Sequence, residues 1–396
     1  MNQTTLHVYS GRQDAALHGR QGCLPLRCCG NLAAVCLFLL ASLVSGGAAT
    51  NVVEYDFNAM LQPVPATANF SDPEYNIWCG SAVKGDDGKY HMFYSRWPRK
   101  RGHFAWVTHS EVAHAVSDSP FGPWQHRDVT LPARGTNFWD GSCTHNPTVL
   151  RIGKKFYLYY MGNYGDGVVR LPLNWEHRNH QRIGVAVADH PAGPWQRFDQ
   201  PIVDINPDRT AFDSLCVTNP AAAVRPDGGI LLIYKAVQVL EGKVMGGNVR
   251  YGAALAARPE GPYVKTAGRI FESDTPGASG HWMLAEDPYL WPDPAPGGGY
   301  LAIARDVVGT FTGDTGAIAL FQSPDGLHWK PAAHPLVLGQ SFTWADGQRS
   351  RTKVERPALL FIAGQPAVLF GATDGYRKDG QTSFNVQIPL RIDPAP

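Results

Sequence analysis

Short apolar runs separated by turns rich in glycine and proline follow one another along most of the chain. In one stretch a run at 147–151 is followed by "KKFYLYYMG" at 154–162 and by "RIGVAVAD" at 182–189. Runs of this length, rich in β-branched and aromatic residues and bounded by turn residues, are typical of strands. The pattern therefore predicts an all-β protein.

The same order of predicted strands returns along the chain. The turn "SDSPFGPW" at 117–124 recurs as "ADHPAGPW" at 188–195 and as "AARPEGPY" at 256–263. Units begin at Pro147, Pro220, Pro288 and Pro357, spaced by 73, 68 and 69 residues, and a first unit has Ser81 where the others have proline. Five units of about four strands each, at a period near 70, predict a five-bladed β-propeller.

The last unit ends after its third strand, near residue 392. An incomplete blade leaves an exposed sheet edge, so a strand from elsewhere in the chain is needed to close the ring. The segment "NVVEYDF" at 51–57 is predicted to be this N-terminal closing strand.

The N-terminal segment has the features of an export signal. Arg12, Arg20 and Arg27 precede an apolar run at 32–44, which is too short to span a bilayer comfortably and ends in small residues. We expect a signal peptide over 1–49, one catalytic propeller domain over 50–396, and a secreted or periplasmic protein. Retention of the segment as an anchor, or a start further downstream, is the alternative.

Charge and cysteine content exclude some classes of partner. Lys and Arg total 35 against 34 Asp and Glu, so neither nucleic acid nor an acidic membrane surface is an expected partner. Four of the seven cysteines fall within the N-terminal segment, and Cys79, Cys143 and Cys216 remain. Three scattered cysteines make no disulfide framework, and we expect them to be buried in a monomer.

The turn endings, the second strand "DGKYHMFYS" at 87–95 and the "EDP" that opens the fourth unit carry a family resemblance. Over about residues 70–392 the chain resembles the glycoside hydrolase family 43-like superfamily, five-bladed enzymes that include families 32, 62, 68, 117 and 130. It resembles families 43 and 117 in particular. The resemblance implies an exo-acting, inverting hydrolase of a plant or algal oligosaccharide or polysaccharide.

In a propeller, the first residues of the innermost strands and the last residues of the second strands lie on one face. We expect a polar cleft with an aromatic rim there, the usual form of a small-ligand site. The predicted substrate-binding residues are Trp78, Arg96, Trp139, His145, Asn146, Asn219, Lys235, Trp282, Asp287, Glu355 and Arg356. Asn163, Asp306 and Asp374 are further second-strand ends.

Glycoside hydrolysis uses two carboxyl groups. The resemblance implies a base Asp on blade one, a pKa-tuning Asp on blade three and an acid Glu, often in Glu-Gly-Pro, on blade four. Glu286 matches the acid, and we expect Trp282 and Trp291 to desolvate its carboxyl and raise its pKa.

The other two carboxylate positions depart from that pattern, because blade three has Asn219 and the blade-one segment "YNIWCGSAV" has no Asp. The motif Asp-x-x-Cys-x-x-Asn-Pro occurs at 140–147 and at 213–220. Asp140 and Asp213 are therefore nominated as the base and tuning carboxylates, with Asp72 as the blade-one alternative.

Several alternatives stay open. Each Asp or Asn before proline also fits a turn cap, and Glu355 with Arg356 fits a structural ion pair. No cofactor is expected except for a structural calcium in the central channel, bound by His145 through water. A propeller that binds carbohydrate without cutting it, or a glycoside phosphorylase with cations around a phosphate, are the rival functions.

Overall fold

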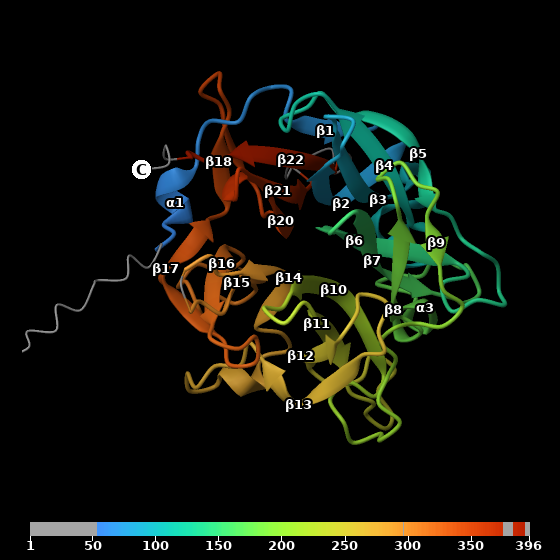
Figure 1. Cartoon of the computed structure of the whole chain (residues 1–396). Coiled ribbons are helices and arrows are strands. Elements are labelled where there is room, and N and C mark those ends of the chain that lie inside the picture. Colours follow the sequence, from blue (N-terminus) through green and yellow to red (C-terminus); the bar gives the residue numbers. More distant parts are fainter. Residues whose placement is uncertain (1–53, 296, 375–382, 393–396) are drawn as a thin grey trace, which may run out of the picture. The chain divides into compact units, whose positions relative to one another are not determined.

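The computed structural model describes residues 54–295, 297–374 and 383–392. Five four-stranded antiparallel sheets are arranged around a central axis (Figure 1). Blade one contains β2 (Tyr75–Lys84), β3 (Tyr90–Pro98), β4 (Glu111–Ser117) and β5 (Gln125–Leu131). Blade two contains β6 (Cys143–Ile152), β7 (Lys155–Asn163), β8 (Arg182–Ala188) and β9 (Gln196–Arg197). The predicted five-bladed propeller is confirmed.

The remaining blades repeat this order. Blade three contains β10 (Cys216–Val224), β11 (Ile230–Val237), β12 (Val249–Ala256) and β13 (Val264–Ile270). Blade four contains β14 (Ala285–Pro292), β15 (Tyr300–Asp306), β16 (Ile318–Ser323) and β17 (Lys330–Leu338). Blade five contains β20 (Glu355–Ile362), β21 (Gln365–Thr373) and β22 (Phe384–Pro389), and a small hairpin of β18 (Ser341–Thr343) and β19 (Arg349–Arg351) precedes it.

The fourth strand of blade five comes from the N-terminal side of blade one. It is β1 (Asn69–Ser71), which pairs with β22 and so joins the last blade to the first. The expected closing strand at 51–57 differs from this, because residues 54–56 have no regular structure and α1 (Phe57–Met60) begins at Phe57. Residues 51–53 and the predicted signal peptide at 1–49 lie outside the described residues.

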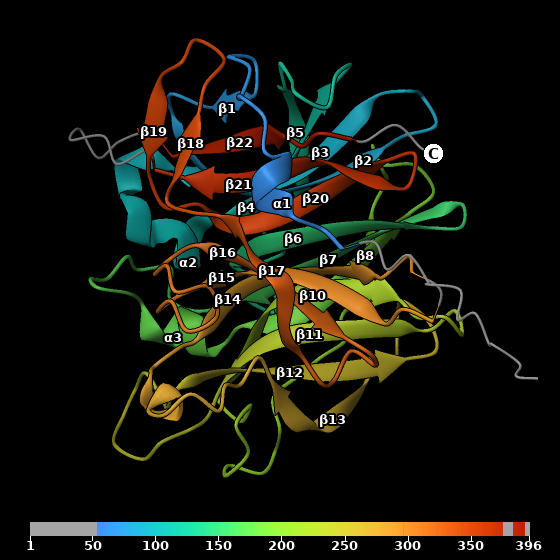
Figure 2. The ribbon, with the colours of Figure 1, turned by 90° about the vertical axis from the view of Figure 1, so that its left-hand side faces the viewer.

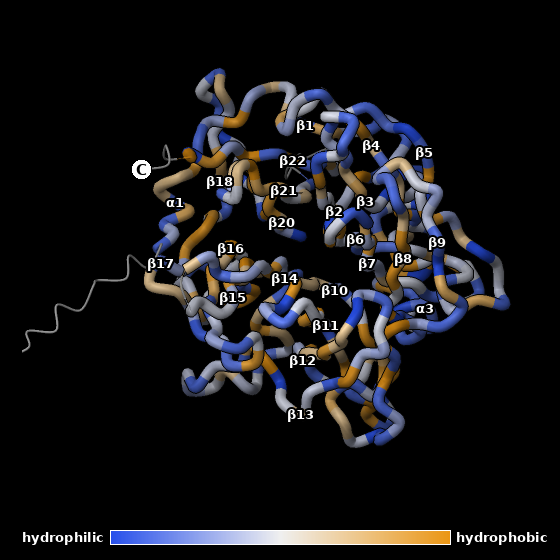
Figure 3. Tube along the Cα trace, in the orientation of Figure 1, coloured by the Kyte–Doolittle hydropathy of each residue, from blue (hydrophilic) through white to orange (hydrophobic). Residues whose placement is uncertain are grey.

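The repeated Gly-Pro-aromatic turn packs neighbouring blades together. Gly122, Gly193 and Gly261 have φ values of 74°, 85° and 94°, a backbone region that glycine enters without steric penalty. The aromatic residue after the turn packs against the preceding blade of the ring: Trp124 of blade one contacts Phe370 of blade five, and Trp195 of blade two contacts Phe93 of blade one. Hydrophobic positions along the strands supply the rest of the packing between blades (Figure 3).

Apart from α1, the short helices lie in loops that connect strands. α2 (Trp106–His109) follows η1 (Arg99–Arg101) and η2 (His103–Ala105) in the loop between β3 and β4, and α3 (Trp175–Asn179) lies between β7 and β8. η3 (Ala278–Gly280) precedes β14. Figure 2 shows α2 and α3 on the same side. Among the described helices, none is both long and apolar enough to cross a membrane.

Each innermost strand contains the same β-bulge. The strand pairing shifts register after Trp78, His145, Thr218, Glu286 and Glu355. The next residue has a positive φ, between 50° and 59°, in all five blades: Cys79, Asn146, Asn219, Asp287 and Arg356. Bulges of this kind re-aim side chains and are frequent at functional sites.

This register corrects one sequence assignment. Gly80, and not Ser81, occupies the position of Pro147, Pro220 and their equivalents, because it follows the bulge residue Cys79. A Cβ atom at Gly80 would lie 2.2 Å from Nδ2 of Asn385, so any side chain there would have to displace Asn385.

Candidate active site

A cavity of about 220 Å³ opens on the face where the innermost strands begin. All five residues that precede the bulges line it: Trp78, His145, Thr218, Glu286 and Glu355. The volume lies below the range of about 300–1,000 Å³ that is usual for drug-sized ligands. The cavity is therefore suited to a group of about the size of one sugar ring.

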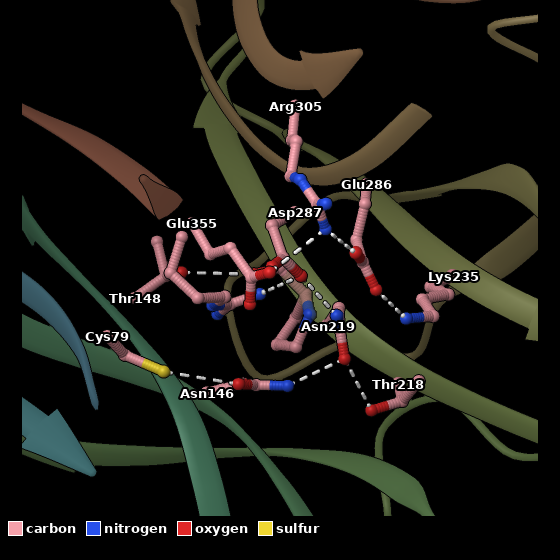
Figure 4. A network of polar contacts seen from close by, with 12 residues as sticks. Cys79, Asn146, Thr148, Thr218, Asn219, Lys235, Glu286, Asp287, Arg305 and Glu355 are labelled. Carbon is pink, nitrogen blue, oxygen red and sulfur yellow. Dashed lines mark hydrogen bonds and ion pairs between the residues drawn. The ribbon is translucent and has the colours of Figure 1, made fainter. Parts of the chain in front are cut away.

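The five bulge residues form a chain of polar contacts across the floor of this cavity (Figure 4). The Cys79 thiol donates to Oδ1 of Asn146 at 3.2 Å, and Asn146 Nδ2 donates to Oδ1 of Asn219 at 2.6 Å. Asn219 Nδ2 donates to Oδ1 of Asp287, which also accepts from Nη1 of Arg356 at 3.0 Å. Each blade thus contributes one side chain to a connected polar layer.

The ion pair in this layer is almost completely buried. Asp287 is 5% exposed and Arg356 is 8% exposed. Burial lowers the pKa of Arg356, but Asp287 outweighs it and raises the pKa, so the guanidinium is charged. The same guanidinium counteracts the effect of burial on Cys79, whose thiol pKa is nevertheless raised. Cys79 is therefore a neutral thiol.

Two carboxyl groups lie above this layer and share one cation. Nη1 of Arg305 is 3.0 Å from Oε2 of Glu286 and 3.0 Å from Oε1 of Glu355. Lys235 Nζ lies 2.6 Å from Oε1 of Glu286, and Lys353 Nζ lies 2.8 Å from Oε1 of Glu355. Side-chain exposure is 15% for both glutamates. The pair is therefore screened from bulk water.

The environments of the two glutamates push their pKa values in opposite directions. Burial alone raises the pKa of Glu286, but Lys235 and Arg305 outweigh it and hold the pKa below the ordinary value. Burial and the negative charge of Glu286 raise the pKa of Glu355, although Arg305 and Lys353 oppose them. A proton shared by the pair thus lies preferentially on Glu355.

This distribution corrects the expected raised pKa of Glu286. That expectation puts Trp282 and Trp291 against the carboxyl, with no cation nearby. Trp291 instead packs in the hydrophobic core against Phe57, and Trp282 is 46% exposed at the cavity rim. The ion pairs of Glu286 with Lys235 and Arg305 therefore determine the direction of its pKa shift.

Aromatic side chains form one wall of the cavity. Trp78, Trp97, His103, Trp106 and Trp175 line it. His145 also lines it, is 4% exposed and shares a 2.7 Å hydrogen bond between Nδ1 and the Ser110 hydroxyl. Burial, and then the charge of Arg356, holds the His145 pKa well below its usual value, so this ring is neutral.

The structure brings together most of the predicted catalytic and substrate-binding residues. Trp78, His145, Asn146, Asn219, Lys235, Trp282, Glu286, Asp287, Glu355 and Arg356 all line the cavity. Four of the nominated residues do not: Asp140, Asp213, Arg96 and Trp139.

Asp140 is a buried structural anion, contrary to its nomination as a catalytic carboxylate. It is fully buried, 2.7 Å from Arg134 and 3.2 Å from Arg197, and it accepts a hydrogen bond from the Tyr160 hydroxyl. These contacts fix the loop before β6 to the outer strands of blade two. Asp140 therefore lies behind the cavity wall.

Asp213 has the same structural position in blade three. It is 1% exposed and accepts from the Tyr234 hydroxyl at 3.0 Å and from Lys265 Nζ at 2.6 Å. The repeated Asp-x-x-Cys-x-x-Asn-Pro motif thus marks an anchor between the first loop and the outer strands. Asp72, the blade-one alternative, accepts from the backbone N–H groups of Glu74 and Tyr75 and caps a turn.

Trp139 and Arg96 also point elsewhere. Trp139 stacks on Tyr160, with a centroid distance of 5.5 Å, and belongs to the packing of blade two. Arg96 pairs with Glu111 at 2.9 Å and lies over the Tyr75 ring. Sequence position alone places both at the cleft, and their packing partners take them away from it.

The register of the second strands explains why Arg305 was missed. Lys235 lies opposite Thr218, and the equivalent residue opposite Glu286 is Arg305. The sequence pattern places the next residue, Asp306, on the cleft face. Its carboxylate instead accepts hydrogen bonds from the N–H groups of 309–312 and caps the loop that follows β15. A shift of one residue turns a strand side chain to the other face.

The three cysteines outside the N-terminal segment are free and buried, as expected. Within the described ranges, no group of three or more His, Cys, Asp or Glu side chains is placed to hold a metal ion. The channel side chains Asn146, Asn219 and Asp287 already bond one another. These residues do not fit the predicted calcium.

The fold is shared with solved glycoside hydrolase structures. A family 117 glycoside hydrolase, Zg3597 from the marine bacterium Zobellia galactanivorans, has a TM-score of 0.53 at 18% identity, over 85% of this chain and 91% of that one. An endo-arabinase from Bacteroides thetaiotaomicron has a TM-score of 0.51 at 12% identity, over 84% and 98% of the two chains. A thermostable family-43 glycoside hydrolase has a TM-score of 0.51 at 12% identity, over 85% and 98%.

No family model matches this sequence, and no curated protein sequence matches it. At these identities the structural likeness establishes the five-bladed fold alone.

Proposed function

We propose that the protein is a glycoside hydrolase whose catalytic pair is Glu286 and Glu355. The observation that carries the proposal is the pair itself: two buried carboxyl groups, joined through Arg305, whose pKa values are pushed apart in a cavity of about 220 Å³. One protonated and one ionised carboxyl group is the requirement for cleavage of a glycosidic bond. The shared fold of the solved hydrolases supports it.

In this mechanism Glu355 is the general acid. It donates its proton to the glycosidic oxygen as the bond between that oxygen and the anomeric carbon breaks. The ionised Glu286 stabilises the positive charge that develops on the sugar ring, and one of its carboxylate oxygens exchanges its ion-pair contact for a bond with the anomeric carbon. Water then attacks this carbon, gives a proton to Glu355 and releases Glu286.

The separation of the pair bears on stereochemistry. Two oxygens that each lie 3.0 Å from Arg305 Nη1 are within about 6 Å of each other. Inverting enzymes separate their carboxyl groups by about 6.5–9.5 Å and retaining enzymes by about 5–5.5 Å. Inversion, the outcome implied by the sequence resemblance, stays a prediction, but this geometry favours retention.

The small cavity supports exo action on a plant or algal oligosaccharide, because one terminal ring fills it. Trp282 at the rim provides an apolar surface for the next ring. Secretion through the signal peptide at 1–49 is part of the same proposal, since such substrates occur outside the cell. Action as a monomer without a cofactor also stays a prediction.

The rival candidate is a propeller that binds sugar without cutting it. The bulge residues of blades one and three are Cys79 and Asn219, on the blades where the resemblance places two aspartates. The absence of carboxyl groups at these two positions favours a non-catalytic propeller, unless Glu355 acts as the second carboxyl group of the catalytic pair.

The experiment is a screen of nitrophenyl glycosides and of plant and algal oligosaccharides, followed by variants of the pair. We expect Glu286→Gln and Glu355→Gln each to lower kcat by about 10²–10⁴-fold. Glu74→Gln, which changes an exposed glutamate outside the cavity, is the control. Sugar binding without release of any product, in the wild-type protein, would identify the rival.

A second set of variants separates the roles. Glu355→Ala should keep much of its activity on dinitrophenyl glycosides, whose leaving group needs no proton. Glu286→Ala should regain activity with azide and form a glycosyl azide. The reverse pattern would assign the acid to Glu286. Turnover that requires inorganic phosphate would indicate a phosphorylase instead.

A further inference from the structure

The blade-two wall of the cavity contains a cation without a carboxylate partner. Arg178, in α3, lines the cavity and is 7% exposed. Its Nη1 donates to Oδ1 of Asn179 and to the backbone oxygen of Met245, each at 3.1 Å, which fixes the guanidinium in place. Lys235 and Arg356, the other Lys and Arg residues of the lining, are both ion-paired. Arg178 forms no ion pair with any carboxylate of the described ranges.

A second donor lies on the same wall. Gln181 lines the cavity, is 2% exposed, and its side-chain Nε2 has no hydrogen-bond partner. A buried amide donor without an acceptor is costly, and such groups in native proteins call for an explanation. An acceptor atom of a bound ligand would satisfy it.

The balance of charge around the cavity also favours an anion. Four cations, Lys235, Arg305, Lys353 and Arg356, pair with three carboxyl groups, Glu286, Asp287 and Glu355. Arg178 adds a further positive charge, and the carboxyl group of Asp374 acts on Lys353 and His103 from nearby. The cations therefore exceed the carboxyl groups by one even when all of these carboxyl groups are ionised. An excess of positive charge around a cleft raises the local concentration of anionic ligands.

We propose that Arg178 and Gln181 bind the anionic substituent of an acidic sugar, a carboxylate or a sulfate ester. The planar guanidinium presents paired donors that match either group. Trp175, which lies 5.6 Å from the Arg178 guanidinium and also lines the cavity, provides a flat surface beside it. The inference rests on the proposed function only in placing the glycosidic bond of that sugar at Glu286 and Glu355.

The test is calorimetric binding of matched monosaccharides to the full protein. Glucuronate is compared with glucose, galacturonate with galactose, and glucose sulfate with glucose. We expect one of the acidic sugars to bind about 10–100-fold more tightly than its neutral counterpart, the range for hydrogen bonds to a charged group. The carboxylate and sulfate arms identify which anion the site accepts.

Variants of the two donors should change this discrimination and leave neutral sugars unaffected. Arg178→Gln should equalise the affinities for the acidic and neutral sugars, and Arg178→Lys should keep part of the difference. Gln181→Glu, which adds a negative charge, should weaken only the acidic sugar. Arg151→Gln removes an equal charge at the far end of β6, where Arg151 pairs with Asp86, and should have no effect.

Equal affinity of the wild-type protein for both members of every pair would overturn the proposal. An equal loss of affinity for acidic and neutral sugars in Arg178→Gln would also overturn it, because the result would assign Arg178 a structural role. Binding of inorganic sulfate without any sugar acid would also contradict it. The binding experiment does not require turnover, so it tests this site separately from the hydrolase. If the protein cleaves no glycoside but still prefers the acidic sugar through Arg178, the proposed hydrolase is wrong and the anion site is supported.

Discussion

Glu286 and Glu355 are 69 residues apart in the sequence, and both bind Nη1 of Arg305 at 3.0 Å. Each is the residue before the bulge in the innermost strand of its blade, β14 or β20. The repeat of the blades therefore creates the pair, because equivalent positions of adjacent blades face the same axis. Two repeats that differ in their outer loops still place their carboxyl groups at one point.

The opposed pKa shifts predict a bell-shaped dependence of kcat/KM on pH. Activity requires Glu286 ionised and Glu355 protonated. It should fall at low pH as Glu286 takes up a proton, with a midpoint below the ordinary glutamate value of 4.5, and at higher pH as Glu355 loses its proton, with a midpoint above 4.5. The measurement is a pH profile on the best substrate of the screen.

Glu355→Gln should remove the alkaline limb of this profile, because the amide has no proton to lose. Glu74→Gln should leave both limbs in place, since Glu74 is exposed and outside the cavity. An alkaline limb that persists in Glu355→Gln would show that another group is the acid.

Arg305 is predicted to hold the pair together. In Arg305→Met the two buried carboxyl groups lose the cation between them, so both pKa values should rise and the acidic limb should move to higher pH. Loss of one partner from a buried ion pair costs about 3–5 kcal/mol, which urea unfolding at pH 7 would measure.

Protonation of a glutamate removes part of that cost, so the stability deficit of Arg305→Met should shrink below pH 5. Arg305→Lys, which keeps the charge but not the planar guanidinium, should show a smaller deficit. A deficit in Arg305→Met that does not change with pH would argue that the loss comes from packing alone.

The sequence predicted the fold well because the repeated residues meet requirements that arise within a few positions of the chain. Gly122 and Gly193 adopt a positive φ that their turns require, and the aromatic residue after each turn packs two blades together. These are short-range requirements, visible as "GPW". The closing strand was placed wrongly, since nothing in three residues of β1, Asn69–Ser71, distinguishes them from a loop.

The candidate site was predictable only where the bulge position was known. Proline marks that position in four blades and led to Asn146, Asn219 and Asp287, but Arg305 was missed because the second strand has no such marker. Arg178 and Gln181 lie in the connection between β7 and β8, outside the strands that the blades repeat. The sequence does not show where a buried aspartate such as Asp140 points. Its direction depends on tertiary contacts, here the ion pairs with Arg134 and Arg197.

Asp287 and Arg356 are predicted to form a coupled pair in the cavity floor. Arg356→Met leaves Asp287 buried with the amide of Asn219 but without a cation, and should destabilise the protein by about 3–5 kcal/mol. Asp287→Asn in the same protein should recover part of this loss. The measurement is a double-mutant cycle from urea unfolding of the four proteins.

A sum of the two single losses equal to the loss in the double variant would contradict the coupling. The same cycle on Lys89 and Asp118, an exposed pair with 43% and 87% side-chain exposure, is the control and should give little coupling.

Asp140 is predicted to stabilise the fold without taking part in catalysis. Asp140→Asn leaves Arg134 and Arg197 without their buried anion and should cost about 3–5 kcal/mol in urea unfolding. Turnover per folded molecule should not change, because Asp140 does not line the cavity. Asp199→Asn is the matched control: it removes a carboxylate that pairs with the same Arg134 but is 79% exposed, so its effect should be much smaller. A loss of kcat in Asp140→Asn, at a temperature where the variant is fully folded, would return Asp140 to the catalytic machinery.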